Sequence, residues 1–375
     1  MDFSFTEEQL AVAEAAGAIF AGKSKPKRVA EVEKTADRFD EELWSELARA
    51  HLLGLGIPEE HGGSGLGLTE VCLLLEQQGR AVAPVPLWAT LVLGAAPLAR
   101  FGTPAQQARW LPAIVAGDAR LSAALNEPAA SDARRPGVRS VPDGSAWRLE
   151  GTAVAVPQAH LAARVLVPVR MGGDGPSAVV LVDPAAPGVT LERAITTDRQ
   201  VHPHLHFDGT VVPSDDVVAG PDAGDDAIAW MLDTARTGLC AIQLGVTEDA
   251  LRRAASYLNE RHQFGRPLST FQGTMLRAAD AYIDTEAIRV TTWQAAWRLD
   301  TGRPAAEAVA VAHWWASDAG QRVVHATQHL HGGVGADIEF PIHRYFLWGK
   351  QIELMLGSPG AELARLGELV TEGAR

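Results

Sequence analysis

Hydrophobic residues are spaced in two different ways along this chain. From Thr6 to about Gly117 they recur every three to four positions, which is the spacing of amphipathic helices. Between about 121 and 223 they form short runs separated by Gly, Pro and Asp, which favours strands. From Asp225 onward the helical spacing returns. The first helix of this last part is predicted to have one apolar stripe, made by Ile228, Leu232, Ala235, Leu239, Ile242 and Val246.

This order of patterns predicts an α+β protein with three domains. We expect an N-terminal helical domain over residues 1–120, a small antiparallel β-barrel or β-sandwich over 121–223, and an up-down helical bundle over 224–375. Within the bundle, the helices after the first are expected at about 268–299, 304–331 and 338–356, with a last helix ending near 370.

Composition narrows the functional classes. The chain has 375 residues, 47% of them hydrophobic, so it is long enough to bury more than one core. Its net charge of −13 argues against a nucleic-acid-binding surface, which would need a basic face. No apolar run approaches the roughly 20 residues of a membrane span, and the acidic start is not typical of a signal peptide. We expect a cytoplasmic protein that binds neither nucleic acid nor membrane.

Three histidines, His202, His204 and His206, alternate along a predicted strand in the segment "VHPHLHFDG". Alternation places them on one face of the strand. Three ligands in a row on one straight strand do not easily converge on a single ion. We therefore predict an exposed or interfacial histidine face and no metal site.

Several segments follow one another in a distinctive order. These are "GIPEEHGGSGLGL", "FDGTVVPSDDVV", "YLNERHQFGRPLSTFQ" and "LHGGVGADIEFPIHRYFLWGKQ". Together they resemble the acyl-CoA dehydrogenase family over nearly the whole chain. The resemblance implies that FAD lies between the β domain and the bundle and accepts a hydride from an acyl-CoA. A carboxylate removes the neighbouring proton, and electron-transfer flavoprotein is the expected electron acceptor.

The resemblance also locates the catalytic base, and no acid stands there. In the common arrangement a Glu precedes a Gly-Ser or Gly-Thr pair, and this position is Leu356. In a variant group the Glu lies on the first bundle helix, near Arg236. Loss of a general base typically costs about 10²–10⁴ in rate, so we expect no catalytic residue in this chain. Glu353 and Asp233 remain as alternatives for a relocated base.

The expected flavin wall in the β domain has changed as well. Where the family has an aromatic residue and then a Thr, this chain has Ala155 and Pro157. Proline has neither an N–H nor a hydroxyl to offer the flavin ring. In the earlier wall Asn126 replaces a Thr and Ala130 replaces a Gly. Asn126 and Ser131 are the weaker candidates for cofactor binding, because both side chains can donate hydrogen bonds.

Two other segments match the part of the family that holds the ADP half of a neighbouring subunit's FAD. Arginine suits a pyrophosphate by charge and geometry, and glycines let backbone amides approach phosphates closely. On spacing alone, a helix-end ion pair and a glycine helix cap would explain the same residues. The cofactor-binding candidates are Arg261, Gln263, Phe264, His329, His331, Gly332 and Gly333.

A chain with the ADP-side residues but without a base resembles half of an active site. It is similar to the base-less β subunits of actinobacterial α2β2 acyl-CoA dehydrogenases of steroid side chains, the 3-oxocholest-4-en-26-oyl-CoA dehydrogenase type. This implies a homologous α subunit that carries the Glu, FAD shared between the subunits, and a steroid-derived acyl-CoA substrate. The alternatives are a self-sufficient homomeric dehydrogenase with a relocated base and a non-catalytic structural subunit.

Overall fold

The computed structural model describes residues 4–126, 135–144, 146–172 and 175–373. By its internal contacts the chain divides into two compact units. The bundle unit comprises Met1–Glu31, Cys72–Ala83 and Arg236–Arg375. The β unit comprises Val32–Val71 and Pro84–Ala235. The predicted fold class, with helices before and after a β domain, is confirmed. The predicted bounds of the three domains stay predictions.

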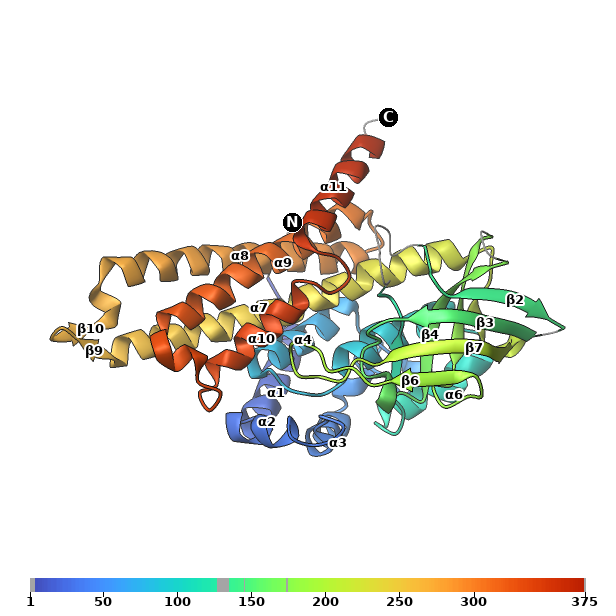
Figure 1. The fold of residues 1–375 in the computed structure, drawn as a ribbon, viewed down its shortest axis with the longest axis horizontal. Coiled ribbons are helices and arrows are strands. Elements are labelled where there is room, and N and C mark those ends of the chain that lie inside the picture. The colour runs from blue at the N-terminus through green and yellow to red at the C-terminus, as the bar shows by residue number, and fades with distance from the viewer. Residues whose placement is uncertain (1–3, 127–134, 145, 173–174, 374–375) are drawn as a thin grey trace. The chain divides into compact units, whose positions relative to one another are not determined.

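The β unit is built on a sheet of eight strands within the described residues, in the order β6-β7-β3-β2-β4-β5-β8 with β1 paired to β4. Most neighbours pair antiparallel, as predicted, but β1 and β2 each pair parallel with β4. The strands, visible in green in Figure 1, are β1 (Leu121–Ala123), β2 (Arg139–Asp143), β3 (Ala146–Ala153), β4 (Arg164–Met171), β5 (Ser177–Val182), β6 (Val189–Glu192), β7 (His204–Pro213) and β8 (Val217–Ala219).

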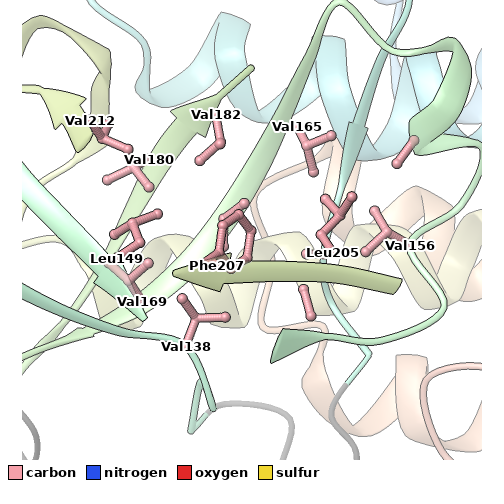
Figure 2. Close-up of a cluster of buried hydrophobic side chains, with 14 of the residues drawn as sticks. Val138, Leu149, Val156, Val165, Val169, Val180, Val182, Leu205, Phe207 and Val212 are labelled. Carbon is pink, nitrogen blue, oxygen red and sulfur yellow. The ribbon is translucent and has the colours of Figure 1, made fainter. Parts of the chain in front are cut away.

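Inward side chains of these strands form the core of the β unit (Figure 2). Val165 and Val169 of β4 are fully buried, as is Leu205 of β7, and Phe207 lies two residues further along the same face. β-Branched side chains pack well on a pleated surface, which explains why valine dominates these strands. Leu205 and Phe207 alternate with His204 and His206 along β7, so one face of this strand is apolar and buried and the other is polar.

The histidine prediction is correct for two of the three residues. His204 and His206 lie on the half-exposed face of β7, and His206 Nε2 lies 2.8 Å from Glu192 Oε2. His202 precedes the strand and is buried, so the prediction of an exposed position is wrong for it. Burial lowers the pKa of its imidazole, while Asp198 acts in the opposite direction. Among the described residues no cluster of three or more potential metal ligands occurs.

The remaining elements of the β unit are helical segments, most of them from the N-terminal part of the chain, together with the start of α7. Along the sequence, α2, α4 and α7 each begin in one unit and end in the other. No helix in the described ranges is long and apolar enough to cross a membrane. The N-terminal helices are α1 (Glu7–Lys23), α2 (Pro26–Val32), α3 (Glu41–Arg49), α4 (Leu68–Ala81), the π-helix η3 (Trp88–Ala95), α5 (Ala96–Phe101) and α6 (Pro104–Val115).

Long antiparallel helices form the bundle unit, as the spacing predicts. The short hairpin β9–β10 lies at the end of the bundle where α7 ends and α8 begins (Figure 1). α10 is shorter than the predicted 338–356, because its last expected turn contains Leu356 in a left-handed conformation. The elements are α7 (Gly224–Glu260), β9 (His262–Gln263), β10 (Arg266–Pro267), α8 (Gln272–Asp300), α9 (Ala306–Leu330), η7 (Gly332–Ala336), α10 (Ile342–Ile352) and α11 (Pro359–Gly373).

Two glycines allow α4 and α7 to pack backbone against backbone. A Cβ atom added at Gly245 would lie 1.9 Å from the carbonyl oxygen of Glu76, and one added at Gly79 would lie 2.1 Å from that of Ile242. Real Cβ atoms do not approach backbone oxygens so closely, so only glycine fits at either position. This close contact brings the polar side chains of both helices together.

A buried polar network then joins α4, α7 and α10. Tyr345 Oη lies 2.5 Å from Asp249 Oδ2 and 2.8 Å from the carbonyl oxygen of Arg80. Arg253 Nε donates to Asp249 Oδ2 at 2.6 Å. Burial alone would raise the pKa of Asp249, but Arg253 and the hydroxyl of Tyr345 outweigh it and hold that pKa below its ordinary value. The network is therefore charged at neutral pH.

Tyr345→Phe is expected to lower the free energy of unfolding by about 1–3 kcal/mol, because the network loses the one hydroxyl proton available to Asp249 Oδ2 and the Arg80 carbonyl, and Arg253 Nε loses an acceptor. Tyr282→Phe is the matched control, since Tyr282 is 59% exposed on α8. It should stay within about 0.5 kcal/mol of wild type. Urea denaturation of both variants measures the difference, and equal midpoints would contradict a stabilising role for the network.

Candidate functional site

The first predicted cofactor segment forms a hairpin after α7. The backbone N–H of Arg261 donates to the carbonyl oxygen of Tyr257, which continues the helix into the hairpin. Phe264 has φ 53° and is 90% exposed. Its ring lies edge-to-face with that of Phe271, and the two ring centroids are 6.1 Å apart. Arg261 and Gln263 are exposed on the same hairpin. The hairpin therefore exposes these predicted residues to solvent.

The second predicted segment is a glycine turn at the end of α9. Gly332 has φ 63°, a left-handed conformation that favours glycine. Both Gly332 and Gly333 are exposed, and among the described residues no heavy atom beyond the adjoining ones of the turn lies within 4 Å of the place that a Cβ would occupy at either one. The backbone of this turn is therefore open to the approach of a ligand.

Ring contacts bring the two segments to the same end of the bundle unit. The imidazole of His331 stacks on Tyr257 with ring centroids 4.8 Å apart, and both rings contact Phe340. His331 is buried, and its Nδ1 lies 2.7 Å from the carbonyl oxygen of Thr327. Leu258 and Leu330 belong to one apolar cluster beside these rings. His331 therefore supports the glycine turn, while the glycines form its surface.

A cavity of about 360 Å³ lies beside the glycine turn. Of the predicted residues, His329 and Gly332 line it. The sequence did not predict the other lining residues, although Gln328 directly precedes His329, which was predicted. Gln328 Oε1 is buried without a hydrogen-bond partner in the described structure. The cavity is lined by His325, Gln328, His329, Gly332, Ala336 and Phe346.

These residues fit the ADP half of a dinucleotide. Arg261 supplies a positive charge that matches a pyrophosphate, and the open glycine backbone can present amide groups to it. The side-chain oxygen Oε1 of Gln328 is buried and has no hydrogen-bond partner among the described residues, and a buried acceptor of this kind is normally satisfied by a donor from a ligand or by water. A positive charge, an open backbone and an unpaired acceptor thus occur at one end of the bundle unit.

The two positions where the resemblance places the base contact each other. Leu356 is buried and has φ 57°. Arg236, also buried, donates from Nε and Nη2 to the carbonyl oxygen of Leu356 at 3.3 and 3.0 Å. The same Nε lies 3.1 Å from Glu362 Oε1. A guanidinium therefore occupies the region where either family arrangement would place a carboxylate.

The sequence analysis missed Glu362, a buried carboxylate beside this turn. A Cβ at Gly357 would lie 2.7 Å from Glu362 Oε1. Burial alone would raise the pKa of Glu362. His313, 3.5 Å away, and the neighbouring guanidiniums outweigh burial and hold that pKa below its ordinary value of 4.5. A carboxylate with a lowered pKa is a weak base, so Glu362 acts as the counter-charge of Arg236.

The two alternatives for a relocated base have different surroundings. Glu353 lies in the turn that follows α10, three residues before Leu356, and its carboxylate is ion-paired with Lys350. Asp233 is half-buried on the stretch of α7 that belongs to the β unit, whereas Arg236 starts the stretch that belongs to the bundle unit. Neither alternative is tested by these contacts, and both stay predictions.

The predicted wall of the β unit is occupied by contacts within the chain. Asn126 Nδ2 donates to the carbonyl oxygen of Ala155 at 3.0 Å, and the N–H of Ala155 donates to His204 Nδ1 at 3.0 Å. Ala155 has φ 45°. Asn126 therefore uses a donor that the sequence analysis assigned to the cofactor. Ser131, the other weaker candidate, lies outside the described residues.

Family comparisons agree with this architecture. Residues 6–118 match the acyl-CoA dehydrogenase N-terminal domain, and residues 222–368 match the acyl-CoA dehydrogenase C-terminal domain. The chain belongs to the acyl-CoA dehydrogenase family. Members of this family are oxidoreductases with FAD as cofactor, and solved structures with this fold are described as complexes with FAD or FADH2.

Individual relatives are similar over their full length. A chain described as the Tcur3481-Tcur3483 steroid ACAD is 48% identical with a TM-score of 0.92, and the match covers 98% of this chain and 99% of that one. A chain of the ChsE4-ChsE5 complex from Mycobacterium tuberculosis is 38% identical with a TM-score of 0.93, covering 99% of both. The acyl-CoA dehydrogenase FadE27 of Mycobacterium tuberculosis is 37% identical, covering 99% of both.

Glu362→Gln is expected to lower the free energy of unfolding at pH 7 by about 3–5 kcal/mol, because Arg236 stays buried without its counter-charge. The pKa of Glu362 is depressed in the folded protein. Its contribution is therefore complete above the ordinary value of 4.5 and is lost as the pH falls through the lower folded-state pKa. Urea denaturation at several pH values should show the difference from wild type shrinking below pH 4.5.

Glu368→Gln is the matched control, since Glu368 is exposed on the same helix α11. Its free energy of unfolding should remain within about 0.5 kcal/mol of wild type at each pH. If Glu362→Gln differs from wild type by the same amount at pH 3 and pH 7, the ion pair is not the source of the stability.

Proposed function

We propose that this chain is the β subunit of a heterotetrameric α2β2 acyl-CoA dehydrogenase. It provides the ADP-side half of each FAD site to a homologous α subunit, which carries the catalytic Glu. The observation that carries the proposal is the buried contact of Arg236 with the Leu356 carbonyl. That contact fills the position expected for the base, while the surface around Arg261 and Gly332, which we propose binds the cofactor, remains exposed.

The lack of a carboxylate at the expected base position supports a partner subunit, because the reaction of the family requires a base. Removal of the proton next to a thioester requires a carboxylate that is desolvated but not neutralised. A guanidinium at that position would attract a carboxylate and lower its basicity. FAD, when bound, supplies the hydride acceptor. The proton acceptor is then the Glu of the partner subunit.

The residues of this chain would hold the nucleotide end of the cofactor. Arg261 would neutralise the charge of the pyrophosphate, and the backbone amides of Gly332 and Gly333 would be the donors to its phosphate oxygens. Gln263, Phe264, His329 and His331 would complete the surface around them. In the β unit, Asn126 spends one of its two amide protons on the carbonyl oxygen of Ala155, which weakens the chain's own flavin wall. The tetramer would therefore hold two FAD molecules, both shared between an α and a β subunit.

The substrate assigned by this proposal is a steroid side-chain acyl-CoA. The support comes from the relatives, one of which is described as a steroid ACAD and another as a two-component complex. Electron-transfer flavoprotein is the proposed electron acceptor, and the cytoplasm is the proposed location. The visible spectrum provides a first test. The chain purified alone should be colourless, whereas the co-expressed complex should be yellow and active.

Arg261→Ala is expected to weaken FAD retention by the complex about 10–100-fold, because a charge-assisted contact to the pyrophosphate is lost. The flavin released on dialysis, measured by absorbance and per mole of complex, reports the change. Arg303→Ala is the control, because Arg303 is an exposed arginine that stacks on Trp297 at the α8–α9 turn. Unchanged flavin content in Arg261→Ala would favour the alternative of a structural subunit that does not touch FAD.

Glu353→Gln tests the alternative of a self-sufficient enzyme with a relocated base. Turnover of the complex should remain within about twofold of wild type, since Glu353 is bound to Lys350 rather than placed at the base position. Steady-state kinetics with an acyl-CoA and an artificial electron acceptor measure it. A loss of about a hundredfold or more, the size expected for a general base, would support the relocated-base alternative.

A further inference from the structure

Several polar side chains of α7 and α9 are buried inside the bundle unit without partners in the chain. Gln243 of α7 and Ser317 of α9 are fully buried, and neither the side-chain amide nor the hydroxyl has a hydrogen-bond partner in the described structure. His313, one turn before Ser317, is also fully buried, and its Nε2 has no partner there. Folded proteins satisfy the great majority of buried polar atoms, so these side chains require a ligand within reach.

The packing of α7 against α9 brings these side chains onto one line. A Cβ atom added at Gly320 would lie 1.9 Å from Gln243 Nε2, so the amide lies directly against the backbone of α9. At 100° per residue, His313, Ser317 and Gly320 fall within an arc of about 60° on α9. The face of α9 that receives the amide therefore also carries the hydroxyl and the imidazole. We call this line the α7–α9 seam, and it comprises Gln243, His313, Ser317 and Gly320.

The ion cluster around Glu362 closes one end of the α7–α9 seam. Arg236 Nε and His313 Nδ1 approach Glu362 Oε1 at 3.1 and 3.5 Å. Arg236 precedes Gln243 by seven residues, and His313 precedes Gly320 by seven residues. The two helices therefore run parallel and stay in register along the seam, which is about 10 Å long from His313 to Gly320. The unpaired atoms thus lie between a charged cluster and a glycine contact.

These unpaired atoms include both donors and acceptors. Gln243 offers an N–H group and a carbonyl oxygen, and the hydroxyl of Ser317 can donate or accept. Burial lowers the pKa of His313 against the opposite effect of Glu362, so the ring is neutral at pH 7. Since Nδ1 faces the carboxylate, we assign the proton to Nδ1, which leaves a lone pair on Nε2. Water both donates and accepts hydrogen bonds, whereas an ion would match only half of this set.

We infer that the α7–α9 seam binds at least two ordered water molecules, which connect the amide of Gln243 through Ser317 to His313. A buried water typically makes about three hydrogen bonds. The two amide atoms of Gln243, the hydroxyl of Ser317 and the Nε2 atom of His313 exceed what a single water can satisfy. Through His313 the waters also support the carboxylate of Glu362, which is the counter-charge of Arg236. The inference concerns this chain alone and does not depend on the proposed function.

A double-mutant cycle with Gln243→Met and Ser317→Ala tests the inference in the full chain. Each single variant should raise the equilibrium constant of unfolding about tenfold or more, because the waters and the remaining side chain lose a partner. The two side chains share no hydrogen bond in the described structure, so a shared ligand is what would couple them. The constant of the double variant should therefore be at least about threefold smaller than the two single effects multiplied together. Urea denaturation measures all four proteins.

Ser256→Ala is the matched control, since Ser256 is exposed on the same helix α7. Its equilibrium constant of unfolding should stay within about twofold of wild type. A Gln243→Met variant that is more stable than wild type would show that the amide is dry and would overturn the inference. Single effects that simply multiply in the double variant would overturn it as well.

A crystal structure of the wild-type chain tests the same inference without any substitution. Electron density for water is expected within about 3.2 Å of both the Gln243 amide and the Ser317 hydroxyl. Density that shows these two side chains bonded directly to each other, with no water in the α7–α9 seam, would overturn the inference. Because neither experiment involves flavin or a partner subunit, its outcome is separate from that of the proposed function.

Discussion

A single buried guanidinium holds the C-terminal turn of the bundle unit together, and the proposed function depends on it. Arg236 is in contact with both the carbonyl of Leu356 and the carboxylate of Glu362, and none of these groups is exposed to water. Breaking such a pair by removing one partner is costly, because the remaining charge stays desolvated. The turn after α10 and the start of α11 are therefore held in one arrangement, and that arrangement places a cation at the position where the sequence resemblance predicts a base.

The hairpin end of the bundle unit has a different character. Some of its groups are paired within the chain, as Arg266 is with the ring of Phe271. Arg261, however, is exposed, and the buried oxygen of Gln328 has no hydrogen-bond partner among the described residues. Phe264 is 90% exposed as well. Such groups would gain stability by being buried or paired, which agrees with the proposed binding of a cofactor and a partner at this end.

The sequence predicted the fold well because hydrophobic spacing is a local property. The spacing predicted the helices of the bundle and the strands of the β domain, and the resemblance assigned the base position to Leu356 or Arg236, an assignment that stays a prediction. The sequence did not reveal the burial of Glu362, because nothing in the local sequence separates a buried acid on α11 from an exposed one such as Glu368. It did not reveal the hydrogen bond of Asn126 to Ala155 either, since that bond depends on tertiary contacts. The assignment of Asn126 to the cofactor stays a prediction. The burial of His202 was missed because it precedes the strand.

Left-handed backbone at Ala155 and Leu356 has a consequence for how this protein can change over evolution. Non-glycine residues adopt positive φ only when the surrounding structure imposes it. Any side chain that replaces Leu356 or Ala155 must accept the same left-handed backbone, which residues other than glycine adopt at a cost. In the proposed function, an acid restored at position 356 would also lie in the turn that the Arg236 guanidinium holds, so it would meet a cation that lowers its basicity. A return to self-sufficiency would then need more than one coordinated replacement, and such a subunit would stay dependent on its partner chain.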